Sequence, residues 1–210
     1  MQERSRRIDV RRDGPYVVRD VPLHDERGAA LPAGDAYRLC RCGRSTSKPF
    51  CDDACEDGFD GTETADHGSL EQRRQVYAGE DITIFDVRRV CAHAAVCTDN
   101  LPQAFDVSRA RWIDPNAAPA DELADVVSRC PSGALSWAPS GVDEAVEPDR
   151  EPAILCAANA SYVVRGGVEI VDADGAPYAR RQRVTLCRCG ASMNKPFCDG
   201  THAEIGFSSV

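Results

Sequence analysis

The sequence lacks any long apolar run and any excess of positive charge. No uninterrupted apolar stretch of the chain approaches the 18 or more residues that a membrane-spanning helix needs, so we expect no membrane association. The 25 lysines and arginines are outnumbered by 34 aspartates and glutamates, which leaves a formal net charge of −9 at pH 7. Because nucleic-acid binding needs a basic surface to neutralise phosphates, nucleic acid is not an expected partner.

Several other signals are missing from the chain. The first 14 residues are basic but contain no apolar core of the kind a secretory signal requires, so we expect a cytoplasmic protein without structural disulfides. The sequence has no paired carboxylates, no phosphate-binding glycine loop and no nucleophile elbow, so we identify no catalytic residues and expect no enzyme. What it has in quantity is cysteine, 11 in all, and an odd number inside a cell indicates metal ligation or thiol chemistry.

Two segments of the chain are nearly identical. Residues 37–51 read YRLCRCGRSTSKPFC, and residues 184–198 read VTLCRCGASMNKPFC. Upstream, the string PYVVRD at 15–20 returns as SYVVRGG at 161–167. This self-similarity predicts two related modules at the two ends of the chain, with a third unit between them.

The repeats and two polar linkers define the expected domains. They are a module over 1–66, a linker over 67–79, a middle domain over 80–138, a linker over 139–151 and a module over 152–210. Alternating apolar residues predict hairpins in the modules, so the expected fold is α+β and mainly β, with two small β-rich modules flanking a small α+β domain. Modules of this size usually need a metal or a partner for stability, so metal binding and folding should be coupled.

The middle domain has two clear local patterns. Residues 82–87, ITIFDV, alternate in polarity and predict a half-buried strand. After Pro119, the sequence predicts a helix capped by Asp121, with Leu123, Val126 and Val127 on one face.

The C-terminal repeat holds four residues of the types that bind iron or zinc. Cys187, Cys189, Cys198 and His202 have the spacing C-x-C-x8-C-x3-H. The string CRCGASMNKPFCDGTH resembles the CDGSH iron–sulfur signature at every signature position. This resemblance implies a [2Fe–2S] cluster bound by these four residues, with the histidine on the outer iron. A zinc site built from the same residues is the alternative.

In the N-terminal repeat a cysteine replaces the histidine. Its string is CRCGRSTSKPFCDDAC, so Cys55 stands in the place of His202, and Asp53 in the place of Gly200. One interpretation is an all-thiolate [2Fe–2S] cluster, and the other is a module that keeps its fold without a cluster. We favour the first, because a random loss of histidine would rarely yield a better iron ligand. Its ligands would be Cys40, Cys42, Cys51 and Cys55.

The middle domain offers Cys91, Cys97 and Cys130, the last followed by proline. Ferredoxins use a C-x2-C-x2-C run with a distant Cys-Pro, but here Ala94 stands at the central position of the run. The stretch resembles divergent single-cluster ferredoxins found beside CDGSH modules, which implies a [3Fe–4S] or [4Fe–4S] cluster. His93 is the candidate fourth ligand; the alternative is a histidine that lies beside a [3Fe–4S] cluster without binding it.

The resemblance covers nearly the whole chain and implies a multi-cluster iron–sulfur protein. We expect a soluble electron carrier whose acidic surface docks on a basic patch of a reductase or oxidase. The alternative is cluster storage, cluster transfer to apo acceptors, or redox and pH sensing through the histidine-ligated cluster. CDGSH modules commonly face each other as a dimer, which implies a possible pseudo-dimer within this one chain; the oligomeric state stays open.

Overall fold

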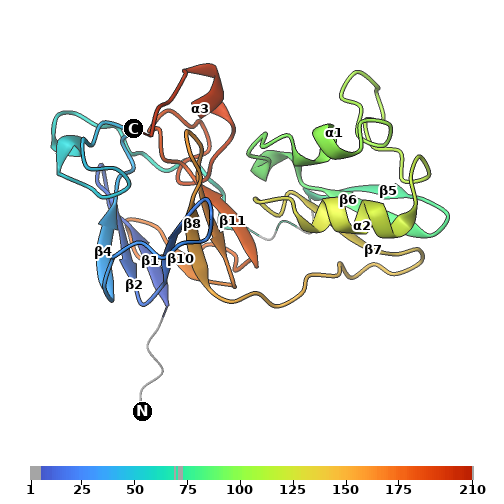
Figure 1. Ribbon diagram of the computed structural model, residues 1–210, viewed down its shortest axis with the longest axis horizontal. Coiled ribbons are helices and arrows are strands. Elements are labelled where there is room, and N and C mark those ends of the chain that lie inside the picture. The colour runs from blue at the N-terminus through green and yellow to red at the C-terminus, as the bar shows by residue number, and fades with distance from the viewer. Residues whose placement is uncertain (1–5, 69, 71–72, 210) are drawn as a thin grey trace, which may run out of the picture. The chain divides into compact units, whose positions relative to one another are not determined.

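The computed structural model describes residues 6–68, 70 and 73–209 of the chain (Figure 1). These divide into two compact units. We call Met1–Gly68 together with Asp149–Val210 the repeat unit, and Ser69–Pro148 the middle unit. The fold is mainly β, as predicted. Within its described residues the chain has no helix long and apolar enough to cross a membrane.

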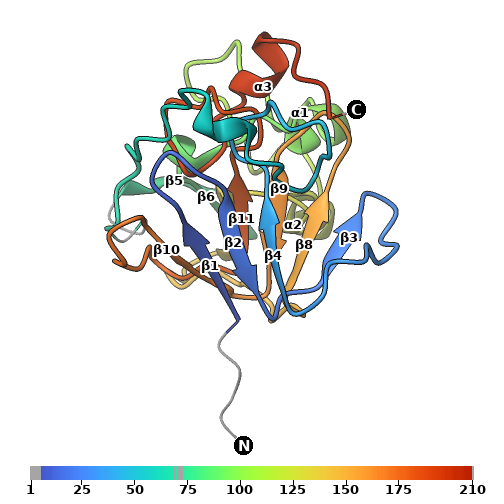
Figure 2. The ribbon, with the colours of Figure 1, turned by 90° about the vertical axis from the view of Figure 1, so that its left-hand side faces the viewer.

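The repeat unit contains two four-stranded sheets (Figure 2). The first has the strand order β10-β1-β2-β4 and the second the order β11-β9-β8-β3. The strands are β1 (Arg7–Val10), β2 (Tyr16–Arg19), β3 (Leu23–Asp25), β4 (Ala36–Leu39), β8 (Ala153–Cys156), β9 (Tyr162–Arg165), β10 (Glu169–Val171) and β11 (Arg183–Leu186).

The two repeats exchange one strand each. β3 and β10 occupy equivalent places in the repeats, yet β3 pairs in parallel with β8, and β10 pairs in parallel with β1. Each sheet therefore takes three strands from one repeat and one from the other. The repeats form a pseudo-dimer within one chain, and neither repeat can complete its sheet alone.

A single apolar core lies beneath both sheets. Ile8 and Leu39 from the first repeat and Ile154 and Leu186 from the second are all fully buried in one cluster. Alternation within the strands supplies these residues; in β2, for example, Tyr16 and Val18 point inward, whereas Arg19 is exposed. Sharing a core lets each small module bury a larger fraction of its apolar surface than it could by itself.

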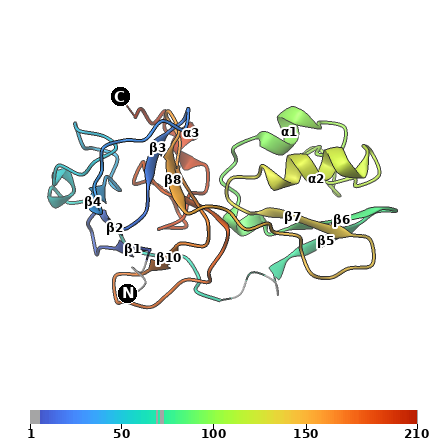
Figure 3. The ribbon, with the colours of Figure 1, turned by 60° about the horizontal axis from the view of Figure 1, so that its bottom comes forward.

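The middle unit is a three-stranded antiparallel sheet covered by helices. β5 (Gln75–Ala78), β6 (Ile82–Asp86) and β7 (Leu135–Pro139) pair in the order β5-β6-β7. The helices α1 (Val96–Asn100) and α2 (Ala120–Ser128) lie on the same side of this sheet (Figure 3). A short 3-10 helix, η3 (Arg88–Val90), links β6 to the cysteine segment.

The predicted helix is confirmed, but its cap is not. Leu123, Val126 and Val127 form the buried face of α2, as expected. The N-cap position is Pro119, and no side chain caps the helix; Asp121 lies inside the first turn, where an acidic side chain is favoured by the helix dipole.

The predicted strand over 82–87 forms as β6, but it is not half-buried. All five of its side chains are buried, because β6 is the central strand and both of its faces are covered. Ile82 and Ile84 pack in the core, and on the opposite face the guanidinium of Arg74 lies 4.1 Å from the ring centroid of Phe85.

The two repeats approach each other closely at a pair of glycines. Gly43 adopts φ +77°, and a Cβ atom there would lie 2.7 Å from the carbonyl oxygen of Cys189. Gly190 adopts φ +81°, and a Cβ atom there would lie 2.7 Å from the carbonyl oxygen of Cys42. Any side chain at either position would push the two cysteine segments apart.

We expect Gly43→Ala to destabilise the repeat unit strongly, because the backbone of Cys189 cannot yield without moving its whole segment. Gly28→Ala is the matched control: Gly28 has φ +81° with nothing within 4 Å of the added Cβ. Both variants carry the left-handed backbone penalty of about 1–2 kcal/mol, and Gly43→Ala should cost about 1–3 kcal/mol more from overpacking. Denaturant unfolding measures both, and equal losses would contradict the close approach.

Candidate metal centres

The N-terminal cysteine loop, residues 40–55, holds its four cysteines as two pairs. The Sγ atoms of Cys40 and Cys42 are 3.8 Å apart, and those of Cys51 and Cys55 are 3.9 Å apart. Cys55 lies in the 3-10 helix η1 (Ala54–Glu56) and is buried, like Cys40 and Cys42, whereas Cys51 is half-buried. Burial chiefly raises the pKa of Cys55, and the nearby Cys42 thiol adds to this, so the two pairs lie close to each other.

The C-terminal cysteine loop, residues 187–202, repeats this arrangement with one changed ligand. The Sγ atoms of Cys187 and Cys189 are 3.8 Å apart, and Sγ of Cys198 lies 3.3 Å from Nδ1 of His202. His202 lies in the one-turn helix α3 (Thr201–Glu204) and is partly exposed. Burial lowers the pKa of His202, which favours the neutral imidazole that can bind a metal.

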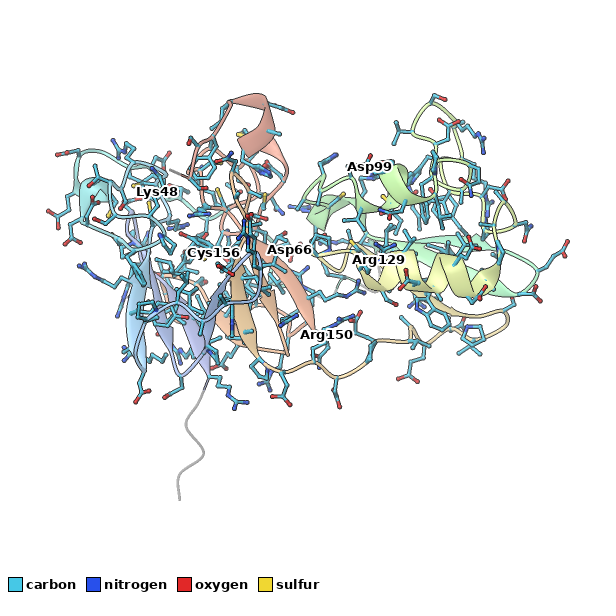
Figure 4. The ribbon with its side chains drawn as sticks, in the orientation of Figure 1. Lys48, Asp66, Asp99, Arg129, Arg150 and Cys156 are labelled. Carbon is cyan, nitrogen blue, oxygen red and sulfur yellow. The ribbon has the colours of Figure 1, made fainter. Side chains whose placement is uncertain are left out.

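The same backbone bonds shape both loops. The N–H of Cys40 donates to the carbonyl of Pro49 at 2.8 Å, and the N–H of Cys187 donates to that of Pro196 at 2.8 Å. Lys48, labelled in Figure 4, lies in the N-terminal loop and precedes a cis proline, as Lys195 does in the other loop. These hydrogen bonds fold each loop back on itself. The second pair of ligands in each loop therefore lies near the first pair.

An aspartate closes each loop. The carboxylate of Asp52 accepts hydrogen bonds from the N–H and hydroxyl of Thr46 at 2.8 and 2.9 Å. In the C-terminal loop the carboxylate of Asp199 accepts from the N–H of Met193 at 2.7 Å and from the hydroxyl of Thr201 at 2.7 Å. The acidic residue after the third cysteine thus fixes the turn that presents the fourth ligand.

The paired donors fit a binuclear cluster better than a zinc ion. A structural zinc site needs four ligands around one point. Among the described residues, no three His, Cys, Asp or Glu side chains converge in a way that would hold one metal ion. Two facing pairs are what a [2Fe–2S] cluster requires, because each of its irons takes two protein ligands. Cys40, Cys42, Cys51 and Cys55 would hold one such cluster, and Cys187, Cys189, Cys198 and His202 the other.

Metal binding at these loops must displace protons. Burial raises the pKa of Cys51 and of Cys198 to about 11, so both thiols are protonated at neutral pH in the metal-free chain. The ligand form is the thiolate, so binding releases these protons and weakens as the pH falls.

The replacement of glycine by Asp53 is accommodated by a second replacement. Asp53 adopts the left-handed conformation with φ 68°, close to the φ of 93° at Gly200. Its carboxylate accepts two hydrogen bonds from the guanidinium of Arg38, at 2.5 and 3.1 Å. The second repeat has Thr185 in the place of Arg38. The two changes therefore form one ion pair that holds the turn before Cys55, a pairing that the sequence analysis missed.

Tyrosines of each repeat bind the cysteine loop of the other. The hydroxyl of Tyr16 lies 2.8 Å from the carbonyl oxygen of Cys187 and 3.0 Å from that of Pro196. The hydroxyl of Tyr162 lies 2.9 Å from the carbonyl oxygen of Cys40 and 3.0 Å from that of Pro49. From the sequence, the repeated YVV strings were predicted only as strands; the Tyr that both strings share was the available signal for this contact.

The three middle-unit cysteines line one cavity of about 260 Å3. Cys91 and Cys97 are half-buried and Cys130 is buried. Burial raises the pKa of Cys91 and raises that of Cys97 to about 11. His93 also lines the cavity; its backbone N–H bonds the Cys91 thiol, and its side chain is exposed. The structure therefore brings together all four residues that the sequence predicted here.

Cys156 stands apart from these sites. It lies on β8, partly buried against the shared core (Figure 4). Burial raises the pKa of its thiol to about 11, which makes it an unreactive protonated thiol at neutral pH.

The folds and donor sets define an iron–sulfur protein. More particularly, the chain is a tandem CDGSH-type protein with a divergent ferredoxin-like domain inserted between its repeats. The family described as iron-binding zinc finger CDGSH type matches residues 13–54 and 159–203, and the family described as divergent 4Fe-4S mono-cluster matches residues 77–139. The predicted cofactors are thereby confirmed, with [2Fe–2S] clusters for the CDGSH regions and a 4Fe–4S cluster for the middle region.

Two relatives are similar to part of this chain. They carry the name "Uncharacterized protein YjdI" and come from Escherichia coli (strain K12) and Escherichia coli O157:H7. Each is 29% identical to this chain over 72 residues, which are 34% of this chain and 95% of the relative. No solved structure matches the chain.

We expect Tyr162→Phe to weaken the N-terminal metal site, although Tyr162 belongs to the other repeat. The change leaves the carbonyl oxygens of Cys40 and Pro49 without this donor, which should destabilise that loop by about 1–3 kcal/mol. Iron-loss rates followed by the EPR signal of each binuclear cluster measure the effect, and Tyr16→Phe should act on the C-terminal signal instead.

The control is Tyr37→Phe, which removes a hydroxyl bonded at 2.7 Å to the carbonyl of Val21, outside the cysteine loops. The reciprocal assignment is contradicted if Tyr162→Phe leaves the N-terminal signal as stable as Tyr37→Phe does.

Proposed function

We propose that the chain is a soluble cytoplasmic electron-transfer protein and not an enzyme. The observation that carries this proposal is the presence of three separate thiol sites with three different donor sets: four cysteines, three cysteines with a histidine, and three cysteines in the middle unit. Iron–sulfur clusters supply one-electron chemistry, and their potentials depend on ligand charge, hydrogen bonds to sulfur and solvent exposure. A chain with graded sites can take electrons from one partner and deliver them to another.

The residues around the thiols favour this role. Backbone N–H groups point at the sulfurs: that of Arg44 lies 3.5 Å from Sγ of Cys42, and that of Asp53 lies 3.4 Å from Sγ of Cys51. Such donors stabilise added negative charge without moving, which keeps the cost of reduction low. His202 and Cys51 are partly exposed, so each loop has a ligand near the surface where a partner docks.

The two CDGSH sites should differ in potential. A neutral imidazole at His202 leaves the C-terminal cluster less negative than the N-terminal cluster, which has a thiolate at Cys55 instead. A less negative cluster is easier to reduce. The Arg38 and Asp53 charges near the N-terminal site cancel each other as an ion pair, so they do not offset this difference.

The acidic chain suits partners with a basic docking patch. Its formal net charge of −9 would attract a positively charged region of a reductase or oxidase and speed a transient encounter. Association should accordingly weaken as the ionic strength rises.

We expect Cys55→His to raise the midpoint potential of the N-terminal cluster, because it replaces a charged thiolate with a neutral imidazole. The matched change, His202→Cys, should lower the potential of the C-terminal cluster. Redox titration followed by EPR measures both. If Cys55→His leaves the N-terminal potential at its original value, ligand charge does not set the order of the sites.

A second candidate function is cluster storage or delivery, or redox and pH sensing, through the C-terminal site. The observation that favours it is the position of His202, partly exposed on a four-residue helix, while its counterpart Cys55 is buried. An exposed neutral ligand competes for metal with protons and water.

If the chain delivers its cluster, mixing the loaded protein with an apo acceptor should move the C-terminal cluster and leave the N-terminal one in place. The visible spectrum follows this transfer. His202→Cys should stop it, since a thiolate is held more firmly. Absence of transfer from the unaltered protein over hours would leave electron transfer as the function.

A further inference from the structure

The middle unit is one cysteine short of a four-iron cluster. Its cavity is lined by the thiols of Cys91, Cys97 and Cys130, and Ala94 stands where ferredoxins have another cysteine. Since this region matches a 4Fe–4S family, one iron there must take a ligand other than cysteine. The identity of that ligand follows from the other side chains that line the same cavity.

Asp86 is one of those side chains, and its environment is unusual. It ends β6, lines the cavity and is 2% exposed. One carboxylate oxygen, Oδ2, accepts a hydrogen bond from Nε1 of Trp112 at 3.1 Å and lies 3.4 Å from the guanidinium of Arg88. The other oxygen, Oδ1, is buried and has no hydrogen-bond partner among the described residues.

A buried carboxylate oxygen without a partner is costly. A buried charged group that lacks a hydrogen-bond partner destabilises a protein by roughly several kcal/mol. Trp112 and Arg88 fix the carboxylate through Oδ2 alone and leave Oδ1 available. Binding a metal through Oδ1 is the simplest way to remove this free-energy cost, because a carboxylate oxygen can bind iron directly.

The other side chains of this cavity that carry oxygen or nitrogen atoms already make hydrogen bonds or face water. The hydroxyl of Thr98 donates to the carbonyl of Ala95 at 3.1 Å, and Oγ of Ser132 lies 3.3 Å from the N–H of Ala134. The side chain of His93 is exposed, so solvent satisfies its imidazole. Compared with Thr98, Ser132 and His93, only Asp86 is buried and has an oxygen atom without a hydrogen-bond partner among the described residues.

The charges also fit a carboxylate ligand. An anionic oxygen replaces the charge of the missing thiolate, which a neutral imidazole would not do. Arg88 lies next to both anions, 3.4 Å from Oδ2 of Asp86 and 4.0 Å from Sγ of Cys91. Its guanidinium is held over the ring of Trp112 at 3.9 Å, so the compensating positive charge is fixed in place.

We propose that Oδ1 of Asp86 binds the iron of the middle cluster that has no cysteine ligand. Trp112 and Arg88 act as positioning residues that hold the carboxylate by its other oxygen. This inference rests on the four-iron assignment of the middle unit, and it concerns the coordination of that cluster and not its redox role.

The test compares Asp86→Asn with His93→Ala in the full, anaerobically loaded chain. The amide of Asp86→Asn keeps an acceptor for Trp112 but is a poor iron ligand. We expect this variant to lose one iron under mild oxidation at least about tenfold faster, because removal of a direct ligand should cost no less than the roughly 10–100-fold that loss of an indirect ligand partner causes. The oxidised three-iron cluster that results has an EPR signal, and its growth measures the rate.

His93→Ala should lose the iron at the rate of the unaltered protein. Folding of the middle unit is followed separately by denaturant unfolding detected by tryptophan fluorescence. Both tryptophans of the chain, Trp112 and Trp137, lie in this unit. Ala94→Cys provides a rescue, because a fourth thiolate in the cysteine run should make the iron insensitive to Asp86→Asn.

Three results would overturn the proposal. Equal rates in Asp86→Asn, His93→Ala and the unaltered protein would assign the position to a solvent ligand, and rapid loss in His93→Ala alone would assign it to histidine. A middle unit that holds no iron in the unaltered protein would overturn the four-iron assignment as well, whereas the first two results leave electron transfer intact.

Discussion

Each cysteine loop of the repeat unit is fastened by a tyrosine hydroxyl from the opposite repeat, and much of the structure depends on this exchange. Tyr16 holds the carbonyl of Cys187, and Tyr162 holds that of Cys40. Their rings meet edge to face with centroids 6.2 Å apart, within the shared core. Two further features also join the repeats. Gly43 and Gly190 let the two loops touch, and the strands β3 and β10 each pair with a strand of the other repeat. Each metal site therefore depends on residues of both repeats.

The arginine between the first two cysteines extends this connection. Arg41 is buried, and its guanidinium lies 5.7 Å from the ring centroid of Tyr16; Arg188 lies 5.1 Å from that of Tyr162. Each arginine belongs to one loop and contacts the tyrosine that holds the other. On this symmetric frame the ligand sets differ at one position, Cys55 against His202. A single ligand exchange thus gives two sites of different charge inside one compact unit.

The sequence predicted the local chemistry well and the contacts between repeats poorly. Spacing within a short loop determines which side chains can meet, so the cysteine groups of both loops and of the middle unit were all identified from motifs. The bond from Tyr16 to Cys187 spans 171 positions, and no local pattern encodes it. The Arg38 and Asp53 pair was visible as two separate differences between the repeats, but only the fold places them in contact. The burial of both faces of β6 likewise depends on Arg74, which lies on another part of the chain.

We infer that one chain holds two binuclear sites and one four-iron site. Quantifying iron and acid-labile sulfide per chain in protein purified without oxygen tests this most directly. We expect about eight irons and about eight sulfides. Zinc without sulfide would contradict it, and about six irons would mean that one of the two binuclear sites stays empty.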